Sequence, residues 1–294
     1  HCDVSLSEHK GGRLICHYCG YTQPMPKLCP KCGSKYILGF KAGTQQIEEK
    51  LKELYPGVRT LRMDADTTRT KDSYEKILSS FANGEADVLI GTQMIVKGHD
   101  FPKVTLVGIL AADLSLNASD YRAGERTFQL LTQAVGRAGR GVLPGEAVIQ
   151  TYQPDHYAIT CAAAQDYESF YQEEILYREL SGYPPVAHML AVQIYGKEEE
   201  NVKQLALRLT DVVKSNMDFL SGKQKEQSNK KIQVLGPAPA NISKINDIYR
   251  YVFYVKHAEY DVLVEVKDRL EETLRQWQPR QMSIQFDFDP VSVL

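Results

Sequence analysis

The stretch that decides the fold spans residues 91–141, which open with GTQMIVKGHDFP (91–102) and close with QAVGRAGRG (133–141). Between these two glycine-punctuated motifs lie a strand-like run, VTLVGIL (104–110), and a helix-like run, RAGERTFQLLTQ (122–133). Before the first motif, an apolar run predicts another buried strand. The opening motif is therefore expected at the carboxyl end of a strand, where open α/β sheets hold their ligands.

The closing motif carries two arginines on a chain that glycines interrupt. Gln133, Arg137 and Arg140 would share one face of a continuing helix. Gly136 and Gly139 predict that the helix ends here and leaves both guanidiniums on a closely approaching loop. Guanidinium is permanently charged and offers forked donors, so this pattern suits phosphate. For so short a motif alone, a polar helix end with solvated arginines is an equal alternative.

The two motifs together resemble the fifth and sixth motifs of superfamily 2 helicases. The matching residues are Thr92, Gly98 and Asp100 in the fifth motif and Gln133, Gly136, Arg137, Gly139 and Arg140 in the sixth. Within that superfamily, residues 87–140 resemble the PriA-like replication-restart helicases almost continuously. Ala134 departs from the wider superfamily, in which an arginine commonly follows the glutamine, and is interpreted as a subfamily trait.

The resemblance implies a nucleotide site built on the arginine motif. Arg137 and Arg140 would neutralise charge on the γ-phosphate, and Gln133 would position the phosphate or a water molecule. Gly98 would allow close approach to the nucleotide, and Asp100 would meet its ribose or an arginine of the sixth motif. The expected cofactor is ATP with Mg²⁺.

DNA contacts are implied at two places. Thr92 and the loop to Lys97 would couple nucleotide hydrolysis to a DNA phosphate. Near the C-terminus, the phrases GYPP, LGPAPA, YRYVFYVKH and DFDP resemble the last domain of the same family. Lys244 and Arg250, on the turn and strand after GPAPA, are the candidate DNA contacts there, with ordinary surface charge as the alternative.

No GxxxxGK[ST] phosphate loop occurs in the sequence. The resemblance implies that this loop and the magnesium carboxylates come from an N-terminal lobe. The chain is therefore expected to be a C-terminal fragment of a longer protein and to hydrolyse no ATP alone.

Five of the six cysteines lie in the first 32 residues, four of them in the pairs CHYCG and CPKCG. Such pairs present thiolates suited to tetrahedral zinc, and we favour zinc over a disulfide framework. Spacing alone suggests one site from Cys16, Cys19, Cys29 and Cys32, with Cys2 left over. His1 and His17 are possible substitutes for the ligands that the family's two-site pattern, given next, leaves missing.

The family resemblance implies a different pairing, because PriA-like helicases carry eight cysteines and bind two zinc ions. On that pattern Cys2, Cys16 and Cys19 belong to one site, and Cys29 and Cys32 to the other. Both sites would lack ligands in this chain, so weak zinc binding is expected.

The predicted fold class is α/β, with three parts and a linker. These are a truncated cysteine-rich zinc module (1–38), a second RecA-like helicase lobe with a parallel sheet (39–153), a helical linker (154–188) and a C-terminal domain (189–294). In the lobe, Thr44 is predicted to cap a helix, residues 104–113 to form a central strand, and Asp113 to support the lobe interface.

From residue 189 the predicted order of elements is strand, helix, strand, strand, helix, strand. This βαββαβ order is typical of the ferredoxin-like α+β arrangement, which hosts many functions and fixes none. The segment KQKEQSNKK (223–231) is predicted to be a basic loop.

Composition is that of a globular protein, with 43% hydrophobic and 24% charged residues among 294. No apolar run approaches the ~20 residues of a membrane span, so a cytoplasmic location without membrane contact is expected, and the resemblance implies association with the nucleoid. The net charge is only −2, which gives no global signature of nucleic-acid binding.

The resemblance implies an ATP-dependent 3′-to-5′ DNA helicase that acts in replication restart at stalled forks. Its expected partners are forked and single-stranded DNA, single-stranded DNA-binding protein, and primosome and helicase-loading proteins. Two alternatives remain: another superfamily 2 translocase, or a zinc-dependent scaffold that binds nucleic acid or protein without motor activity.

Overall fold

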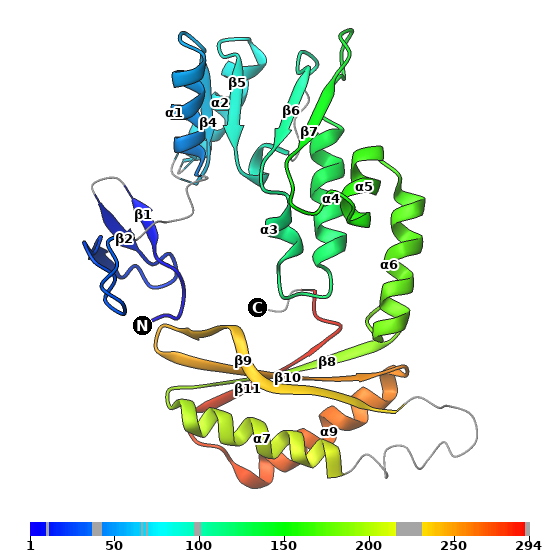
Figure 1. Cartoon of the computed structure of the whole chain (residues 1–294). Coiled ribbons are helices and arrows are strands. Elements are labelled where there is room, and N and C mark those ends of the chain that lie inside the picture. The colour runs from blue at the N-terminus through cyan, green and yellow to red at the C-terminus, as the bar shows by residue number, and fades with distance from the viewer. Residues whose placement is uncertain are drawn as a thin grey trace. The chain divides into compact units, whose positions relative to one another are not determined.

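The computed structural model divides the chain into two units (Figure 1). One unit comprises His1–Pro26, Ser119–Tyr121 and Gln172–Leu294, and the other Lys27–Ala118 and Arg122–Tyr171. The structure describes residues 1–9, 12–36, 43–65, 67–68, 70–96, 101–215 and 231–291. Each unit is described by itself.

The second unit begins with alternating helices and strands: α1 (Thr44–Leu54), β4 (Thr60–Met63), α2 (Lys71–Ala82) and β5 (Val88–Gly91). β4 and β5 pair in parallel, as the sequence predicts. The predicted cap of α1 is wrong. Gly43 occupies the N-cap position, and Thr44 is the first helical residue, with its hydroxyl donating to Asp64 at 2.5 Å.

The rest of this unit holds a 3₁₀ helix (Gln93–Val96), β6 (Leu106–Ile109), α3 (Asp113–Leu116), α4 (Ala123–Val135) and β7 (Glu146–Ile149). β6 and β7 are parallel. Among the described residues they form a pair separate from β4 and β5, so the predicted single sheet is seen as two parallel pairs. Within the described ranges β6 pairs only with β7, so it differs from the predicted central strand, and Leu106 is 63% exposed.

The predicted linker consists of two helices, α5 (Tyr157–Ala164) and α6 (Tyr167–Ser181). α5 buries Ala158 and Ala162 completely. At the start of α6, Phe170 stacks on Phe128 of α4, with ring centroids 4.0 Å apart. These contacts make α5 and the first turn of α6 part of the hydrophobic core of the second unit.

The C-terminal part of the first unit has the predicted βαββαβ order. Its elements are β8 (His188–Gly196), α7 (Glu199–Ser215), β9 (Gln233–Ile245), β10 (Ile248–His257), α9 (Tyr260–Trp277) and β11 (Met282–Phe288). The antiparallel strands lie in the order β11-β8-β10-β9. This order and the helices packed on one face confirm the ferredoxin-like prediction (Figure 1).

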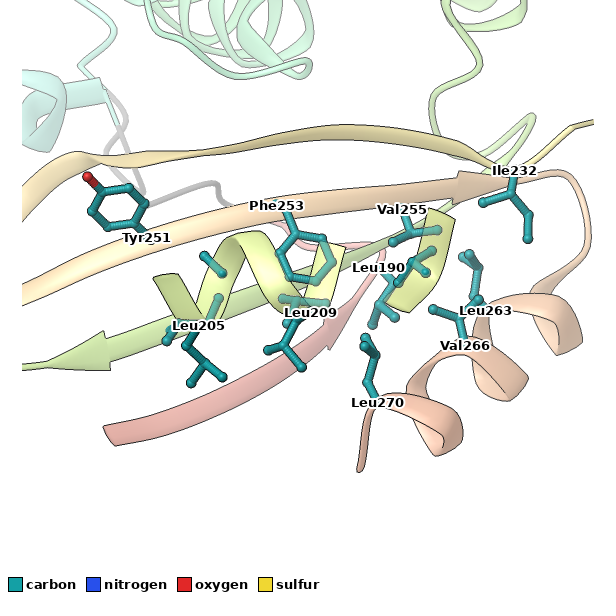
Figure 2. Packing of buried hydrophobic residues seen from close by; sticks show 14 of the residues in the cluster. Leu190, Leu205, Leu209, Ile232, Tyr251, Phe253, Val255, Leu263, Val266 and Leu270 are labelled. Carbon is teal, nitrogen blue, oxygen red and sulfur yellow. The ribbon is translucent and has the colours of Figure 1, made fainter. Parts of the chain in front are cut away.

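Its core lies between the sheet and the two helices (Figure 2). Phe253 on β10, Leu190 on β8, Leu209 on α7 and Leu263 on α9 are fully buried. Inward-facing residues alternate along β8, because successive side chains of a strand point to opposite faces. The opposite face carries Tyr195 and Arg250, which the register of β8 and β10 places side by side.

The hairpin of β9 and β10 corrects one prediction. The strand continues through GPAPA to Ile245, so Lys244 lies in β9 and not on a turn after that phrase. The turn is formed by Asn246 and Asp247, both with positive φ, a conformation that these two residue types tolerate better than most.

The same unit contains a small three-stranded sheet of β1 (Ser7–His9), β2 (Arg13–Ile15) and β3 (Thr22–Pro24). It carries the first cysteine pair at the end of β2. In the described part of the chain, no helix is both long enough and apolar enough to span a membrane.

Candidate motor and metal sites

The arginine motif lies on a loop directly after α4. The helix ends at Val135 with Gly136 as its C-cap, which confirms the predicted break. The side chain of Arg137 reaches the first motif, where its Nη2 donates to the backbone carbonyl of Val96 at 2.6 Å. Arg140 lies on the exposed side of the loop, and its Nε donates to the carbonyl of Gly136 at 2.7 Å.

The arginine loop is closed by two glycines that contact each other. A Cβ built on Gly145 would lie 2.1 Å from the backbone nitrogen of Gly139, and one built on Gly139 would lie 2.6 Å from the nitrogen of Gly145. The N–H of Gly139, whose φ is +73°, donates to the carbonyl of Val104 at 2.9 Å. Only residues without a side chain fit this crossing, which fixes the backbone between the two arginines.

The other predicted motor residues are placed only in part. Gln133 is exposed on the last turn of α4, and Thr92 is exposed directly after β5. Lys97, Gly98 and Asp100 lie outside the described residues. Arg137 nevertheless bonds the residue that immediately precedes Lys97, so the two motifs meet through Val96.

Asp113 holds the loop that follows β7. Its buried carboxylate accepts from the hydroxyl of Thr151 at 2.6 Å and from the N–H of Tyr152 at 3.0 Å. The Thr151 bond, with the Tyr152 N–H second, holds the pKa of Asp113 below its usual value. The carboxylate is therefore occupied locally, whereas the sequence predicts a contribution to the lobe interface.

Three cysteine thiols converge at the start of the chain. The sulfur atoms of Cys2, Cys16 and Cys19 lie within 4.8 Å of one another, and Cys16 is 1% exposed. Cys2 is thus grouped with the first cysteine pair. Cys29 and Cys32 belong to no such group of three potential ligands in the part of the chain that the structure describes.

Both cysteine pairs sit on the same kind of turn. Gly20 donates to the carbonyl of Cys16 at 2.9 Å, and Gly33 donates to that of Cys29 at 2.8 Å. The two glycines have φ of +73° and +69°. In each pair, a four-residue turn that ends at a left-handed glycine places the two thiols on the same side.

Backbone N–H groups favour the thiolate form of the first cysteine in each pair. The N–H of Cys19 and then that of Tyr18 lower the pKa of Cys16. The N–H of Cys32, followed by that of Lys31, lowers the pKa of Cys29. Zinc binds thiolates, usually four in a tetrahedron, so the cluster with Cys2 fits zinc with one ligand still to be supplied.

The two histidines suggested as substitute ligands are placed differently. Nδ1 of His1 lies 2.5 Å from the carboxylate of Asp247. His17 is an exposed residue within the first cysteine pair. Neither joins the group of three cysteines found among the described residues.

The candidate DNA contacts lie on the β9–β10 hairpin. The ammonium of Lys244 is 3.3 Å from Asp247 and 4.7 Å from the ring centroid of Tyr249. The guanidinium carbon of Arg250 is 5.6 Å from the ring centroid of Tyr195. Of the predicted basic loop, residues 223–230 lie outside the described residues.

Sequence reasoning missed the contact between this hairpin and the cysteine cluster. Asn246, at the turn, donates its N–H to the sulfur of Cys2 at 3.3 Å. Nothing in the spacing of either segment signals this contact, because it joins residues 244 positions apart.

A parallel α/β lobe with an arginine loop, joined to a thiolate cluster and a ferredoxin-like domain, defines the C-terminal part of a helicase. Family models match in three places: the PriA DNA helicase Cys-rich region domain at residues 1–24, the helicase conserved C-terminal domain at 28–142 and the primosomal protein N C-terminal domain at 179–291. The chain belongs to the PriA family of replication restart helicases.

Relatives named replication restart protein PriA match nearly the whole chain. The protein from Bacillus subtilis is 42% identical over 100% of this chain and 35% of its own length. The Synechocystis protein is 38% identical over 99% of the chain and 34% of its own length, and the Haemophilus influenzae protein 33% over 96% and 36%. The chain thus spans about a third of the length of these relatives.

Proposed function

We propose that this chain supplies the second motor lobe and the C-terminal domain of an ATP-dependent 3′-to-5′ DNA helicase that acts in replication restart at stalled forks. ATP with Mg²⁺ would be held mainly by an N-terminal lobe, and Arg137, Arg140 and Gln133 would complete its site. Gly98 and Asp100 would contact the nucleotide, while Thr92 and Lys97 would contact DNA.

One observation carries this proposal: the 2.6 Å bond from Arg137 to the carbonyl of Val96. It joins the arginine loop to the segment that leads into Lys97, so movement at a phosphate would be passed to the proposed DNA contact. Arg140 lies on the exposed side of the same loop and would face a nucleotide held by the other lobe. Arginines placed in this way stabilise charge in phosphoryl transfer.

The proposal extends to location and partners. The protein would act in the cytoplasm, associated with the nucleoid, on forked and single-stranded DNA. Single-stranded DNA-binding protein and primosome or helicase-loading proteins would be its protein partners. Zinc would bind the cysteine-rich module at Cys2, Cys16 and Cys19, and at Cys29 and Cys32 in a second site.

The test is ATP hydrolysis with and without an N-terminal lobe. The chain alone is expected to show only background hydrolysis. The chain is then fused to the part of the Bacillus subtilis relative that precedes the matched residues, and DNA-stimulated hydrolysis is expected to appear. In that fusion, Arg140→Ala should reduce turnover by about 10³-fold or more, as for other arginine fingers.

A matched control is Arg275→Ala, which removes an arginine whose side chain is 79% exposed on α9. Its turnover should equal that of the unchanged fusion. If Arg140→Ala lowers turnover by less than about tenfold, this arginine does not stabilise the transition state. Hydrolysis by the chain alone at the rate of the fusion would contradict the two-lobe proposal.

A further inference from the structure

The β9–β10 hairpin, β8 and the turn of the first cysteine pair line an open hollow of about 370 Å³. This volume is at the lower end of the range of small-molecule sites. Six residues line it: Tyr18, Tyr195, Ile242, Ile245, Ile248 and Arg250. They comprise two phenol rings, three aliphatic side chains and one cation, and no acid.

We call this hollow the base hollow. Two of its walls carry flat chemical groups. Arg250 on β10 and Tyr195 on β8 are paired in the sheet register, and the guanidinium carbon lies 5.6 Å from the phenol centroid. Tyr18 comes from the turn between Cys16 and Cys19, and it is 52% exposed. A large aromatic side chain is thus presented to solvent in a hollow that Arg250 also lines.

The wall that carries Tyr18 is tied to the hairpin by backbone N–H groups. Three of them bridge the segments: Asp3 to the carbonyl of Lys244 at 2.9 Å, Asp247 to the carbonyl of His1 at 2.9 Å, and Asn246 to the sulfur of Cys2 at 3.3 Å. The base hollow is therefore built jointly by the cysteine cluster and the C-terminal domain.

We propose that the base hollow takes one unpaired nucleobase of single-stranded DNA. A base is flat, and aromatic rings and guanidinium planes stack on its faces without regard to sequence. The three isoleucines suit the apolar ring surface, and Arg250 attracts the phosphate beside it. This inference rests on the proposed function, because it assumes that this chain contacts DNA. It adds a bound base to the phosphate contact predicted at Arg250.

The test compares two labelled single strands of equal length, one of thymidines and one of abasic deoxyribose phosphates. Binding to the full chain is measured by fluorescence anisotropy at several salt concentrations. The thymidine strand should bind about 5- to 150-fold more tightly, which corresponds to one stacked base. Tyr18→Ala should abolish this preference and leave the affinity for the abasic strand unchanged.

Three further variants guard against misfolding. Tyr18→Phe keeps the ring and should keep the preference. Ile242→Gln alters the hollow from β9 and should reduce the preference, even if Tyr18→Ala disturbs the cysteine turn. Tyr36→Ala removes a tyrosine that is 87% exposed and does not line the hollow, so it should change nothing.

The outcomes separate this inference from the proposed function. Equal, salt-dependent binding of both strands would leave phosphate contacts in place and overturn the base hollow. A thymidine preference that survives both Tyr18→Ala and Ile242→Gln would place the stacking elsewhere and also overturn it. No binding of either strand at low salt would overturn the base hollow together with the DNA contacts proposed for this chain, whereas the two-lobe motor is tested separately by ATP hydrolysis in the fusion.

Discussion

The two arginines of the motor loop differ in what surrounds them. Arg137 is partly buried and donates to the backbone carbonyl of Val96 in the first motif, whereas Arg140 is exposed and donates to the carbonyl of Gly136 in its own loop. The bond of Arg137 therefore joins two motifs, whereas the bond of Arg140 to Gly136 stays within one loop. Substitution of each should separate folding from catalysis.

We expect Arg137→Ala to lower the free energy of unfolding by about 1.5–3 kcal/mol, the usual contribution of a hydrogen bond from a charged group. Arg140→Ala should lower it by less than about 1 kcal/mol, because its side chain is exposed. Urea unfolding of the two variants measures the difference. Equal losses would show that the Val96 bond contributes no more than the local one.

Zinc retention depends on Cys2 if the cluster is the metal site. The unchanged chain is expected to hold less than one equivalent, because three thiolates leave the tetrahedron incomplete. Cys2→Ser should reduce the content further, while Cys161→Ser, on α5, should not. Elemental analysis after dialysis decides this, and one tightly held zinc that survives Cys2→Ser would instead favour Cys16, Cys19, Cys29 and Cys32.

At the scale of residues, local motifs could be predicted and distant contacts could not. The spacing of the cysteine pairs and of the arginines determines their turns, because each turn closes over a few residues. The contacts of Cys2 with Asn246 and of Arg137 with Val96 join distant positions. Only the complete fold brings such residues together.

At the scale of elements, the crossing of Gly139 and Gly145 fixes the arginine loop between α4 and β7. Gly145→Ala would place a methyl carbon 2.1 Å from the backbone nitrogen of Gly139, on the other side of the loop. We expect a loss of about 1–3 kcal/mol in unfolding free energy, together with reduced hydrolysis in the two-lobe fusion.

Gly108→Ala is the matched control for that substitution. Gly108 lies in β6, in the same unit, and a Cβ there meets no atom within 4 Å. Thermal unfolding should show no loss for this variant. If both alanines are tolerated equally, the loop rearranges at little cost and does not constrain the arginines.

Most elements were predicted from periodicity and turn residues, and the errors have physical causes. The ferredoxin-like order follows from clear strand and helix patterns. The end of β9 was misplaced because GPAPA contains two prolines, which usually end strands, but this strand lies at the edge of its sheet. β6 was expected at the centre because an apolar run does not reveal which strands flank it.

At the scale of the whole chain, the first unit contains a partly buried tyrosine, Tyr254, with an acid nearby. Burial raises the pKa of Tyr254 to about 12, with smaller contributions from Asp120 and Tyr183. Below about pH 10 the phenol is neutral in both the folded and unfolded states. Between about 10 and 12 the unfolded chain loses the proton first, so folding stability falls as pH rises through this window.

We therefore expect the free energy of unfolding of Tyr254→Phe to fall less between about pH 10 and 12 than that of the unchanged chain. Urea unfolding across this range measures it, and the phenolate absorbance of the two proteins should differ by one tyrosine that titrates late. Identical pH profiles would show that the ring is solvated in the folded state.

The path of the chain between the two units has a mechanical consequence. The polypeptide passes from one unit to the other four times, after Pro26, Ala118, Tyr121 and Tyr171. A single protease nick anywhere severs at most one of these passages, so the two units remain covalently tethered through the others. A force that pulls the two units apart would likewise be shared among several covalent tethers, and no single linker would bear all of it.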